Sequence, residues 1–494
     1  MKKVINNISN FFSKMSKKTK ITILVVTLLI LGVTVLYQTF ATSSTISGGS
    51  DNYTVTLNNN STVSVPASGH KIVYFKIRNN NKGTVQYGVG YKGTNITVKA
   101  YADSENPSTG TMTESESKFI KLYIENASTS DSSVELISIL GYENGGNLIV
   151  PNGYTLVTSI YTEPVNLVNH ITKLYTSASK TTTTLDSVTY NLASSVGLMN
   201  DRKGSMSIGI DAGNIRYYGA NPNNYIYFNC SDYSNQTSST CETWRIIGVF
   251  DGKVKIMRGS VIGSYSWDSS DSSINDGWGA NEWSQADLMK LLNSGYDSES
   301  VGGSLYWNAK SGTCYNGISN RTTSCNFTST GLKNDTTRNM ITETIYYTRG
   351  HNSSNIYVDV MYDKERVSGT VYDSTRTTLW TGKVALAYSS DYGYAADLSL
   401  CQKQLVSYYN ATCTANNWMN NVITNNGAKA GWLLTPASGS ASDAWYVSSR
   451  GDIRDDYYND ASSSYGVAPV LSLTSELDIG LGSGTSSSPY QLSV

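Results

Sequence analysis

The first forty residues constrain this chain most, because they decide on which side of a membrane the rest folds. Residues 21–37 carry no charged side chain, and the twenty residues before them hold only basic ones: Lys2, Lys3, Lys14, Lys17, Lys18 and Lys20. This pattern predicts a cytoplasmic basic tail over residues 1–20 and a transmembrane signal-anchor over residues 21–40. Thr39-Phe40-Ala41 also resembles a cleavage site, so removal as a signal peptide stays open. In both cases we expect an extracellular C-terminal ectodomain, and the anchor makes the chain a single-pass protein of the cell membrane.

The six cysteines fit an extracellular location. They fall into three closely spaced pairs: Cys230 with Cys241, Cys314 with Cys325, and Cys401 with Cys413. An oxidising exterior permits disulfides, so we expect three local disulfide bonds. Other pairings are formally possible, and free buried thiols are the alternative. A zinc site is disfavoured because no Cys-x-x-Cys occurs and the histidines are few: His70, His170 and His351.

Length and charge limit the functional classes. The chain has 494 residues, a net charge of −1, 15% charged residues and 36 tyrosines. This length allows two or three domains. A net charge so close to zero supplies no basic footprint for nucleic acid, so we expect no nucleic-acid partner.

Residues 41–51 are rich in Ser, Thr and Gly and predict a flexible spacer. From Tyr53 onward the apolar residues alternate, and such runs separated by turns indicate antiparallel strands with one buried face. The runs are Tyr53 to Leu57, Val73 to Ile77, Val85 to Tyr91, Ile96 to Ala100, Ile120 to Ile124, and Leu136 to Ile139. We therefore predict an all-β sandwich over residues 52–163. No exposed cluster stands out in it, which favours a stalk over a glycan-binding or adhesion module.

Residues 164–494 mix helical and strand patterns and predict one α+β domain. The apolar spacing in Leu167 to Ala178 is helical. Asp251-Gly252 between two apolar runs predicts a hairpin over residues 243–257. Ser284 and Asp287 predict a capping box before a short helix. Further helices are expected at about 336–347 and 395–409.

Residues 431–473 form an apolar frame around a polar, tyrosine-rich tract. Trp432, Leu433 and Leu434 at one end, and Val467, Val470, Leu471 and Leu473 at the other, predict buried strands. Tyr and Trp are the side chains that binding loops use for contact area. We therefore expect residues 438–465 to form a recognition loop whose ligand-binding side chains are Trp445, Tyr446, Arg450, Arg454, Tyr457, Tyr458 and Tyr465. A solvated surface loop is the alternative.

The same segment resembles the C-terminal core of a family of bacterial surface domains of unknown function. Its motif is matched by Trp432, Leu433, Thr435 and Pro436 at the start, by Ala444, Val447 and Gly451 in the middle, and by Gly466, Val467, Pro469 and Leu471 at the end. That family is similar to the C-type-lectin-like fold shared by formylglycine-generating enzymes and the target proteins of diversity-generating retroelements. The resemblance implies this fold for the last domain. Gly431, Leu434 and Ala468 depart from the motif, so a site built on its arginines is not implied here.

No catalytic motif stands out, and we expect a protein that is not an enzyme. Gly-x-Ser-x-Gly, phosphate-loop and metalloprotease signatures do not occur. His351 is the one histidine in the main part of the last domain, and an isolated histidine more often lies at a surface. An oxidase resembling the formylglycine-generating enzymes would need a reactive pair such as Cys401 and Cys413, for which a structural disulfide is the simpler interpretation.

We expect no cofactor, with calcium as a weak alternative. Asp452, Asp455, Asp456 and Asp460, with Asn459, offer the oxygen ligands that calcium prefers. Their spacing matches no known calcium loop, and Arg450 and Arg454 are alternative partners for these carboxylates. The sequence thus predicts a cell-surface protein that binds an unknown extracellular ligand, which is a protein, a glycan or the cell wall. The alternatives are an extracytoplasmic enzyme, either an oxidase or a cell-wall hydrolase, and a structural surface-assembly protein.

Overall fold

The computed structural model describes residues 60–142, 148–204, 207–208, 211–269, 277–424, 430–455 and 461–493. The chain divides into two compact units, Met1–Glu163 and Pro164–Val494. The expected tail, anchor and spacer lie outside the described residues. Within the described ranges, no helix is long and apolar enough to cross a membrane.

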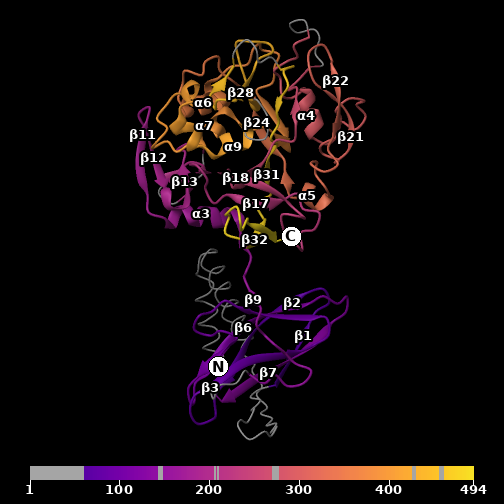
Figure 1. The fold of residues 1–494 in the computed structure, drawn as a ribbon, viewed down its shortest axis with the longest axis vertical. Coiled ribbons are helices and arrows are strands. Elements are labelled where there is room, and N and C mark those ends of the chain that lie inside the picture. Colours follow the sequence, from indigo (N-terminus) through magenta and orange to yellow (C-terminus); the bar gives the residue numbers. More distant parts are fainter. Residues whose placement is uncertain are drawn as a thin grey trace, which may run out of the picture. The chain divides into compact units, whose positions relative to one another are not determined.

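The N-terminal unit is a sandwich of two β-sheets (Figure 1). Its strands are β1 (Asn60–Val65), β2 (His70–Arg78), β3 (Val85–Lys92), β4 (Ile96–Tyr101), β5 (Thr109–Met112), β6 (Ser117–Asn126), β7 (Ser132–Tyr142), β8 (Thr155–Leu156) and β9 (Ile160–Tyr161). One sheet has the order β1-β7-β3-β5, with β8 beside β3, and the other has the order β2-β6-β4-β9. The first seven strands therefore alternate between the sheets, which is the arrangement of a jelly roll. β9, which runs parallel to β4, takes the edge position beside it.

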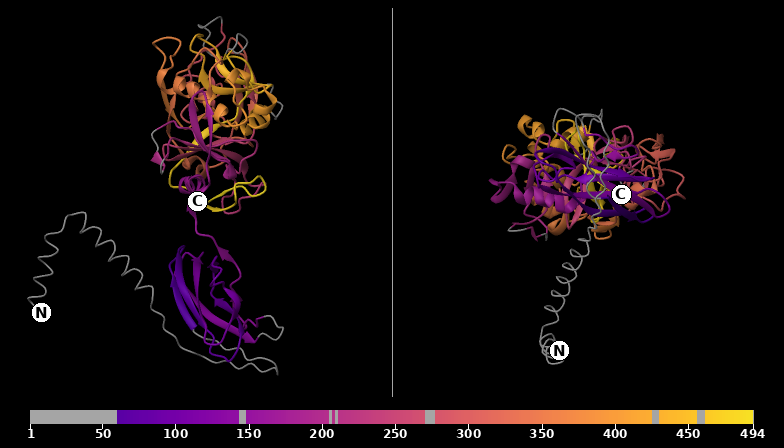
Figure 2. Two further views of the ribbon diagram at one scale, coloured as in Figure 1. Left: turned by 90° about the vertical axis from the view of Figure 1, so that its left-hand side faces the viewer. Right: turned by 90° about the horizontal axis from the view of Figure 1, so that it is seen from below.

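The alternating runs predicted from the sequence form this core. The residues buried between the sheets include Phe75 and Ile77 from β2, Val98 from β4, Leu122 from β6 and Tyr87 from β3. The two sheets lie face to face (Figure 2), and these side chains form the buried cluster of the unit. The predicted β-sandwich is thus confirmed over the described residues, while the first expected strand, Tyr53 to Leu57, lies outside them.

The C-terminal unit also consists mainly of strands. A large sheet has the order β11-β12-β13-β16-β18-β19-β31-β23, with β17 beside β18 and β26 beside β31, and a second sheet has the order β20-β30-β27-β28-β29. The strands of these sheets are β11 (Thr181–Leu185), β12 (Val188–Ala193), β13 (Leu198–Asn200), β16 (Ile215–Tyr217), β17 (Tyr225–Phe228), β18 (Glu242–Phe250), β19 (Lys253–Arg258), β20 (Ser264–Tyr265), β23 (Ile341–Thr342), β26 (Val384–Ala385), β27 (Ala430–Pro436), β28 (Ala444–Ser448), β29 (Ile453–Arg454), β30 (Tyr465–Gly466) and β31 (Val470–Leu473). Smaller ladders join β14 (Ser207–Ile208) to β15 (Asp211–Ala212), β21 (Ser311–Tyr315) to β22 (Thr322–Asn326), and β24 (Thr344–Tyr347) to β25 (Leu379–Gly382).

The two ends of this unit pair with each other. β10 (Val165–Asn166) lies antiparallel to β32 (Asp478–Leu481), which pairs in turn with β33 (Gln491–Ser493). Short helices cover the sheets: α3 (Leu167–Ser177), α4 (Asp287–Leu292), α5 (Asp335–Asn339), α6 (Val358–Asp363), α7 (Ser389–Tyr394), α8 (Ala411–Ala415) and α9 (Trp418–Thr424), with the single turns η1 (Ser194–Val196), η2 (Lys364–Ser368) and η3 (Leu405–Ser407). α6, α7 and β28 lie at the end of the unit away from β32 (Figure 1).

The strongest local signals are confirmed. The helix expected from Leu167 is α3, which starts where the side chain of Asn166 accepts a hydrogen bond from the amide of Asn169. The predicted hairpin is formed by β18 and β19. Its turn residues Asp251 and Gly252 both have positive φ, 47° and 74°, as a tight two-residue hairpin requires.

The other helix predictions are only partly right. α4 is present, but the capping box is wrong, because Ala286 occupies the N-cap position and the Ser284 hydroxyl donates to Glu282 instead. Of the helix expected at 336–347 only α5 forms, since the β-branched and aromatic residues after it pair as β23 and β24. The helix expected at 395–409 is wrong. α7 ends at Tyr394, and the Cys401–Cys413 disulfide closes the following loop.

Candidate functional site

The apolar frame of residues 431–473 is buried as expected. Every residue of β27 and every residue of β31 is buried. The polar tract between them departs from the prediction, because β28 is also buried along its whole length and lies between β27 and β29 in the sheet. Ala444-Trp445-Tyr446-Val447 is therefore a core strand and does not belong to an exposed loop.

The prediction that Trp445 contacts a ligand is therefore wrong. Its side chain is fully buried, and its indole nitrogen donates to the backbone carbonyl of His351. Side chains alternate along a strand, so Trp445 and Val447 enter one core cluster while Tyr446 enters the other. The available signal was four consecutive apolar residues bounded by turn residues, which is typical of a strand buried on both faces.

The turn after β28 brings both predicted arginines, Arg450 and Arg454, to the surface. Asp452 is buried, and its Oδ2 accepts from Arg450 Nη2 at 3.1 Å and from Arg454 Nε at 2.6 Å. The hydroxyl of Ser448 binds the other carboxylate oxygen. The guanidinium groups remain accessible, since the side chains of Arg450 and Arg454 are 57% and 33% exposed. One buried carboxylate thus holds two cationic groups in fixed positions.

Residues of α7 and α8 pack against this turn and fix its position. Tyr392 of α7 donates its hydroxyl to the carbonyl of Gly451 at 2.7 Å. Gly451 has a φ of 90°, and a Cβ atom there would lie 2.6 Å from a methyl group of Thr414. The position therefore requires glycine, both for its backbone conformation and for the close approach.

Tyr446 and Tyr465 extend the arginine pair along the sheet. Tyr446 is the cross-strand partner of Arg454, so the two side chains share one face. The ring of Tyr465 stacks on that of Tyr446 with centroids 4.9 Å apart, and it also packs on Trp432 at 4.6 Å. Tyr446 is 8% exposed, and Tyr465 is partly exposed. Tyr465 is thus the more accessible of the two rings.

Sequence reasoning missed one member of this group, Tyr409. Its ring lies under the guanidinium of Arg450 at 5.4 Å and is 53% exposed. It belongs to the loop closed by the Cys401–Cys413 disulfide. We name the group formed by Tyr409, Tyr446, Arg450, Asp452, Arg454 and Tyr465 the Asp452 surface.

The structure describes only some of the remaining predicted ligand-binding residues and calcium candidates. Tyr457, Tyr458, Asp456, Asn459 and Asp460 lie outside the described residues. Of the other two calcium candidates, Asp455 is partly buried, and Asp452 is engaged by two arginines, which was the alternative interpretation. Within the ranges that the structure describes, no group of three or more His, Cys, Asp or Glu side chains is arranged to hold a metal.

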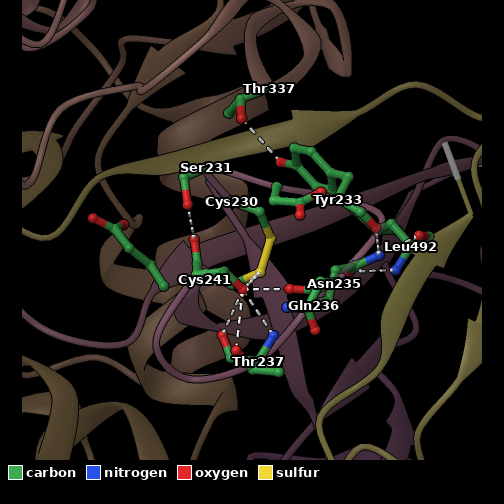
Figure 3. The surroundings of a disulfide bond; sticks show 12 residues. Cys230, Ser231, Tyr233, Asn235, Gln236, Thr237, Cys241, Thr337 and Leu492 are labelled. Atoms are coloured by element: carbon green, nitrogen blue, oxygen red, sulfur yellow. Dashed lines mark hydrogen bonds between the residues drawn. A yellow bond between two sulfur atoms is a disulfide. The ribbon is translucent and has the colours of Figure 1, made fainter.

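All three predicted disulfides are confirmed: Cys230–Cys241, Cys314–Cys325 and Cys401–Cys413. They place the chain in an oxidising, extracytoplasmic environment. The first one closes a loop that is tied to the C-terminal strand (Figure 3). There the amide of Gln236 donates to the carbonyl of Leu492 at 2.6 Å and accepts from its backbone N–H at 3.0 Å. Cys230–Cys241 and Cys401–Cys413 thus close loops, while Cys314–Cys325 joins the paired strands β21 and β22.

A network of buried charges lies beneath α7. Asp391 accepts from Lys255 Nζ at 2.6 Å and from Arg216 Nη1 at 2.8 Å, and Arg216 also pairs with Asp201 at 2.5 Å. Burial alone would raise the pKa of Asp391, but Lys255, Arg216 and Arg366 together hold it well below its usual range. Burial lowers the pKa of Lys255 to about 8 against the opposing attraction of Asp391. Because these side chains are nearly inaccessible, the network supports the fold around α7.

Glu365 continues this network to β27. Its carboxylate accepts from the Ser390 hydroxyl at 2.5 Å, from the Thr435 hydroxyl at 2.7 Å and from Arg366 at 2.7 Å. Thr435 is one of the residues that match the family motif. Its hydroxyl also accepts from the amide of Ser389 at 3.0 Å. Thr435 therefore joins β27 to α7, the helix that supports the turn of the Asp452 surface.

Asp268 and Asp287 form a buried pair of acidic residues at the start of α4. Asp268 Oδ1 accepts from the amide of Asp287 at 3.1 Å, and Asp268 Oδ2 accepts from the amide of Ala280 at 2.7 Å. Burial and the neighbouring Asp287 carboxylate raise the pKa of Asp268 to about 7. Sequence reasoning treated Asp287 as a capping residue, and its carboxylate instead accepts from the amide of Ser269.

His351 and the Cys401–Cys413 pair were the residues weighed for catalysis. Burial lowers the pKa of His351, with a contribution from Lys364. Its backbone carbonyl supports Trp445, as described above. Cys401 and Cys413 are bonded to each other and are buried.

Comparisons with known proteins found very little similarity to this chain. No protein family and no curated protein matches the chain. Among solved structures, the Schizosaccharomyces pombe Cnp3 cupin domain has 11% sequence identity and a TM-score of 0.07, over 21% of this chain and 70% of that domain. A TM-score this low supports no conclusion about fold or function.

Proposed function

We propose that this chain is a membrane-anchored cell-surface protein that binds an extracellular ligand, without catalysis, through the Asp452 surface. The supporting observation is the buried Asp452 carboxylate that holds Arg450 and Arg454. Two exposed arginines normally lose side-chain entropy when they bind, and here a common anchor has already restricted them. The C-type-lectin-like fold stays part of this proposal, on the motif residues in β27, β28 and β31.

The chemistry of the Asp452 surface favours a ligand with an anionic group. Arg450 and Arg454 present their guanidinium groups from one common anchor, the Asp452 carboxylate. Guanidinium groups match carboxylate and phosphate oxygens in geometry. Tyr409 and Tyr465 flank the arginines with rigid aromatic contact area, which is how binding sites recognise one charged group within a larger ligand.

Screening the ectodomain on glycan arrays and on peptidoglycan sacculi tests this proposal. The variants are Arg450→Gln with Arg454→Gln, and Tyr409→Ser. Arg321→Gln, at an exposed arginine after the turn of the β21–β22 hairpin, is the matched control. We expect the first two variants to lose the ligands that the unmodified ectodomain binds, while the control retains them. Unchanged binding by the double arginine variant would reject this site.

A further inference from the structure

The sandwich unit has two outer sheet faces that differ in how they are covered. On the β1-β7-β3-β5 sheet, Ile137 and Ile139 of β7 point outward and are buried under a segment that contributes Leu148, Val150, Tyr154 and Leu156. Gly88 of β3 lies under the same segment, because a Cβ atom there would be 2.7 Å from Leu156. The chain itself therefore covers this face.

The outer face of the β2-β6-β4-β9 sheet presents large side chains to solvent. Tyr74 and Phe119 are 49% and 44% exposed. Tyr101, Tyr123 and Tyr161 on the same face are partly exposed. Alternation along the strands places all of them opposite the core residues Phe75, Ile120, Leu122, Ile124 and Ala100. We name this the tyrosine face. The sequence analysis found no exposed cluster in this domain, because these side chains come together only across strands.

Basic residues occupy the positions between the rings. The outward positions of β2, β6 and β4 hold four cations, Lys76, Arg78, Lys99 and Lys121, and one acidic residue, Glu125. The register sets three of the four cations beside an aromatic ring: Tyr74 pairs with Lys121, Lys76 with Phe119, and Lys99 with Tyr123. With Glu163, which lies near Tyr101 and Tyr161, the tyrosine face has four basic and two acidic side chains, an excess of positive charge in a chain whose net charge is −1.

The rings and cations hold one another in place. Lys121 Nζ lies 3.7 Å from the centroid of Tyr101, and Lys76 Nζ lies 5.4 Å from that of Phe119. Tyr123 and Tyr161 stack with centroids 3.8 Å apart and planes 4° from parallel. A ligand would meet a rigid surface.

We propose that the tyrosine face binds an acidic polysaccharide. Its cations are complementary to carboxylate or phosphate groups on the polymer. Its exposed rings, Tyr74 and Phe119, attract the C–H faces of sugar rings through the negative face of their π-systems. This site is separate from the Asp452 surface, and either proposal can fail without the other.

Affinity electrophoresis of the purified full-length protein tests this proposal, with polygalacturonate as the acidic polymer and dextran as the neutral one. The test variant is Lys76→Gln with Lys99→Gln and Lys121→Gln. The control variant, Lys71→Gln with Lys82→Gln and Lys92→Gln, has the same net charge and changes lysines away from this face. Tyr74→Ser with Phe119→Ser leaves the cations intact and tests the rings.

We expect polygalacturonate, and not dextran, to retard the unmodified protein and the control variant, less strongly as salt is added. The test variant should bind roughly tenfold more weakly, since exposed ion pairs contribute modestly and three are lost. The ring variant should also bind more weakly. Equal retardation of the test and control variants would overturn the proposal. So would sedimentation with phosphatidylglycerol vesicles without any retardation by polygalacturonate, which would indicate a membrane-binding face.

Discussion

Lys255 and Asp391 form a buried ion pair, with Nζ 2.6 Å from Oδ2, that joins strand β19 to helix α7. Arg216 binds the second oxygen of the same carboxylate at 2.8 Å. One acidic side chain thus binds two buried cations, of which Arg216 is also bound by Asp201. The helix held in this way also carries Tyr392, which fixes the turn of the Asp452 surface.

Removing the Asp391 charge should strongly destabilise the C-terminal unit. Asp391→Asn keeps the shape of the side chain but leaves Lys255 and Arg216 without their shared counter-charge. We expect the free energy of unfolding to fall by about 3–5 kcal/mol. Lys310→Gln breaks an exposed pair with Asp297 and should cost less than about 1 kcal/mol. Chemical denaturation of both variants measures their free energies of unfolding. Similar decreases in the two variants would show that the buried network contributes little to stability.

Asp268 should make stability depend on pH. Its pKa is raised to about 7 in the folded state, from an ordinary value of 3.8, by burial and by Asp287. The folded state therefore binds the proton more tightly than the unfolded state. This contribution is complete below about pH 4 and is lost as the pH rises to about 7.

The difference between unmodified protein and Asp268→Asn isolates this effect. Asparagine does not titrate, so unfolding free energies measured from pH 4 to pH 8 should fall less steeply in the variant. Asp297→Asn, at an exposed carboxylate, should leave the slope unchanged. Parallel curves for the unmodified protein and Asp268→Asn would contradict the assignment.

Trp445 should matter for stability. Trp445→Ala empties a fully buried site and removes the hydrogen bond to His351, so we expect a loss of about 3–5 kcal/mol. Trp278 is 40% exposed, and Trp278→Ala should change stability by less than about 1 kcal/mol. Thermal unfolding of the two variants compares them. A Trp445→Ala protein as stable as Trp278→Ala would argue against the buried strand.

The Cys401–Cys413 disulfide should affect both stability and display of Tyr409. Replacing both cysteines by serine opens a loop of sequence separation 12 and should cost about 2–3 kcal/mol. Because Tyr409 lies in that loop, ligand binding should weaken as well. Replacing Cys314 and Cys325, which lie in another hairpin, should lower stability without affecting binding. If both double variants bound the ligand equally well, Tyr409 would not belong to the binding site.

Local chemistry accounts for what the sequence predicted well. The Asp251-Gly252 turn and the apolar stripe of α3 depend on residues close together in the chain, as do the alternating strands of the sandwich. The cysteine pairs were also near neighbours. β28 was misassigned because serine, aspartate and glycine on both sides concealed a four-residue apolar run, and only its position between β27 and β29 explains its burial.

The candidate site was predictable only in part, for a related reason. Arg450, Arg454, Tyr446 and Tyr465 stood out in one tract, but which of them are accessible depends on the β28–β29 register. Tyr409 gave no signal, since tyrosines next to serine and asparagine, such as Tyr408 and Tyr409, are common in a chain with 36 tyrosines. It reaches Arg450 through a disulfide loop and a turn about forty residues further along. The tyrosine face likewise exists only through cross-strand pairing.

The most direct test of the account measures binding of one array-identified ligand to the ectodomain and to its Arg450→Gln, Arg454→Gln variant, with Arg321→Gln as the control. The account predicts at least roughly tenfold weaker binding by the double variant, because two charge-assisted contacts are lost while the fold is kept. It also predicts unchanged binding by the control. The double variant leaves the buried Asp452 carboxylate without its two guanidinium partners, so its melting temperature should fall, and binding is compared at a temperature at which circular dichroism shows all three proteins to be folded. Binding by the double variant as tight as that of the unmodified ectodomain would contradict it.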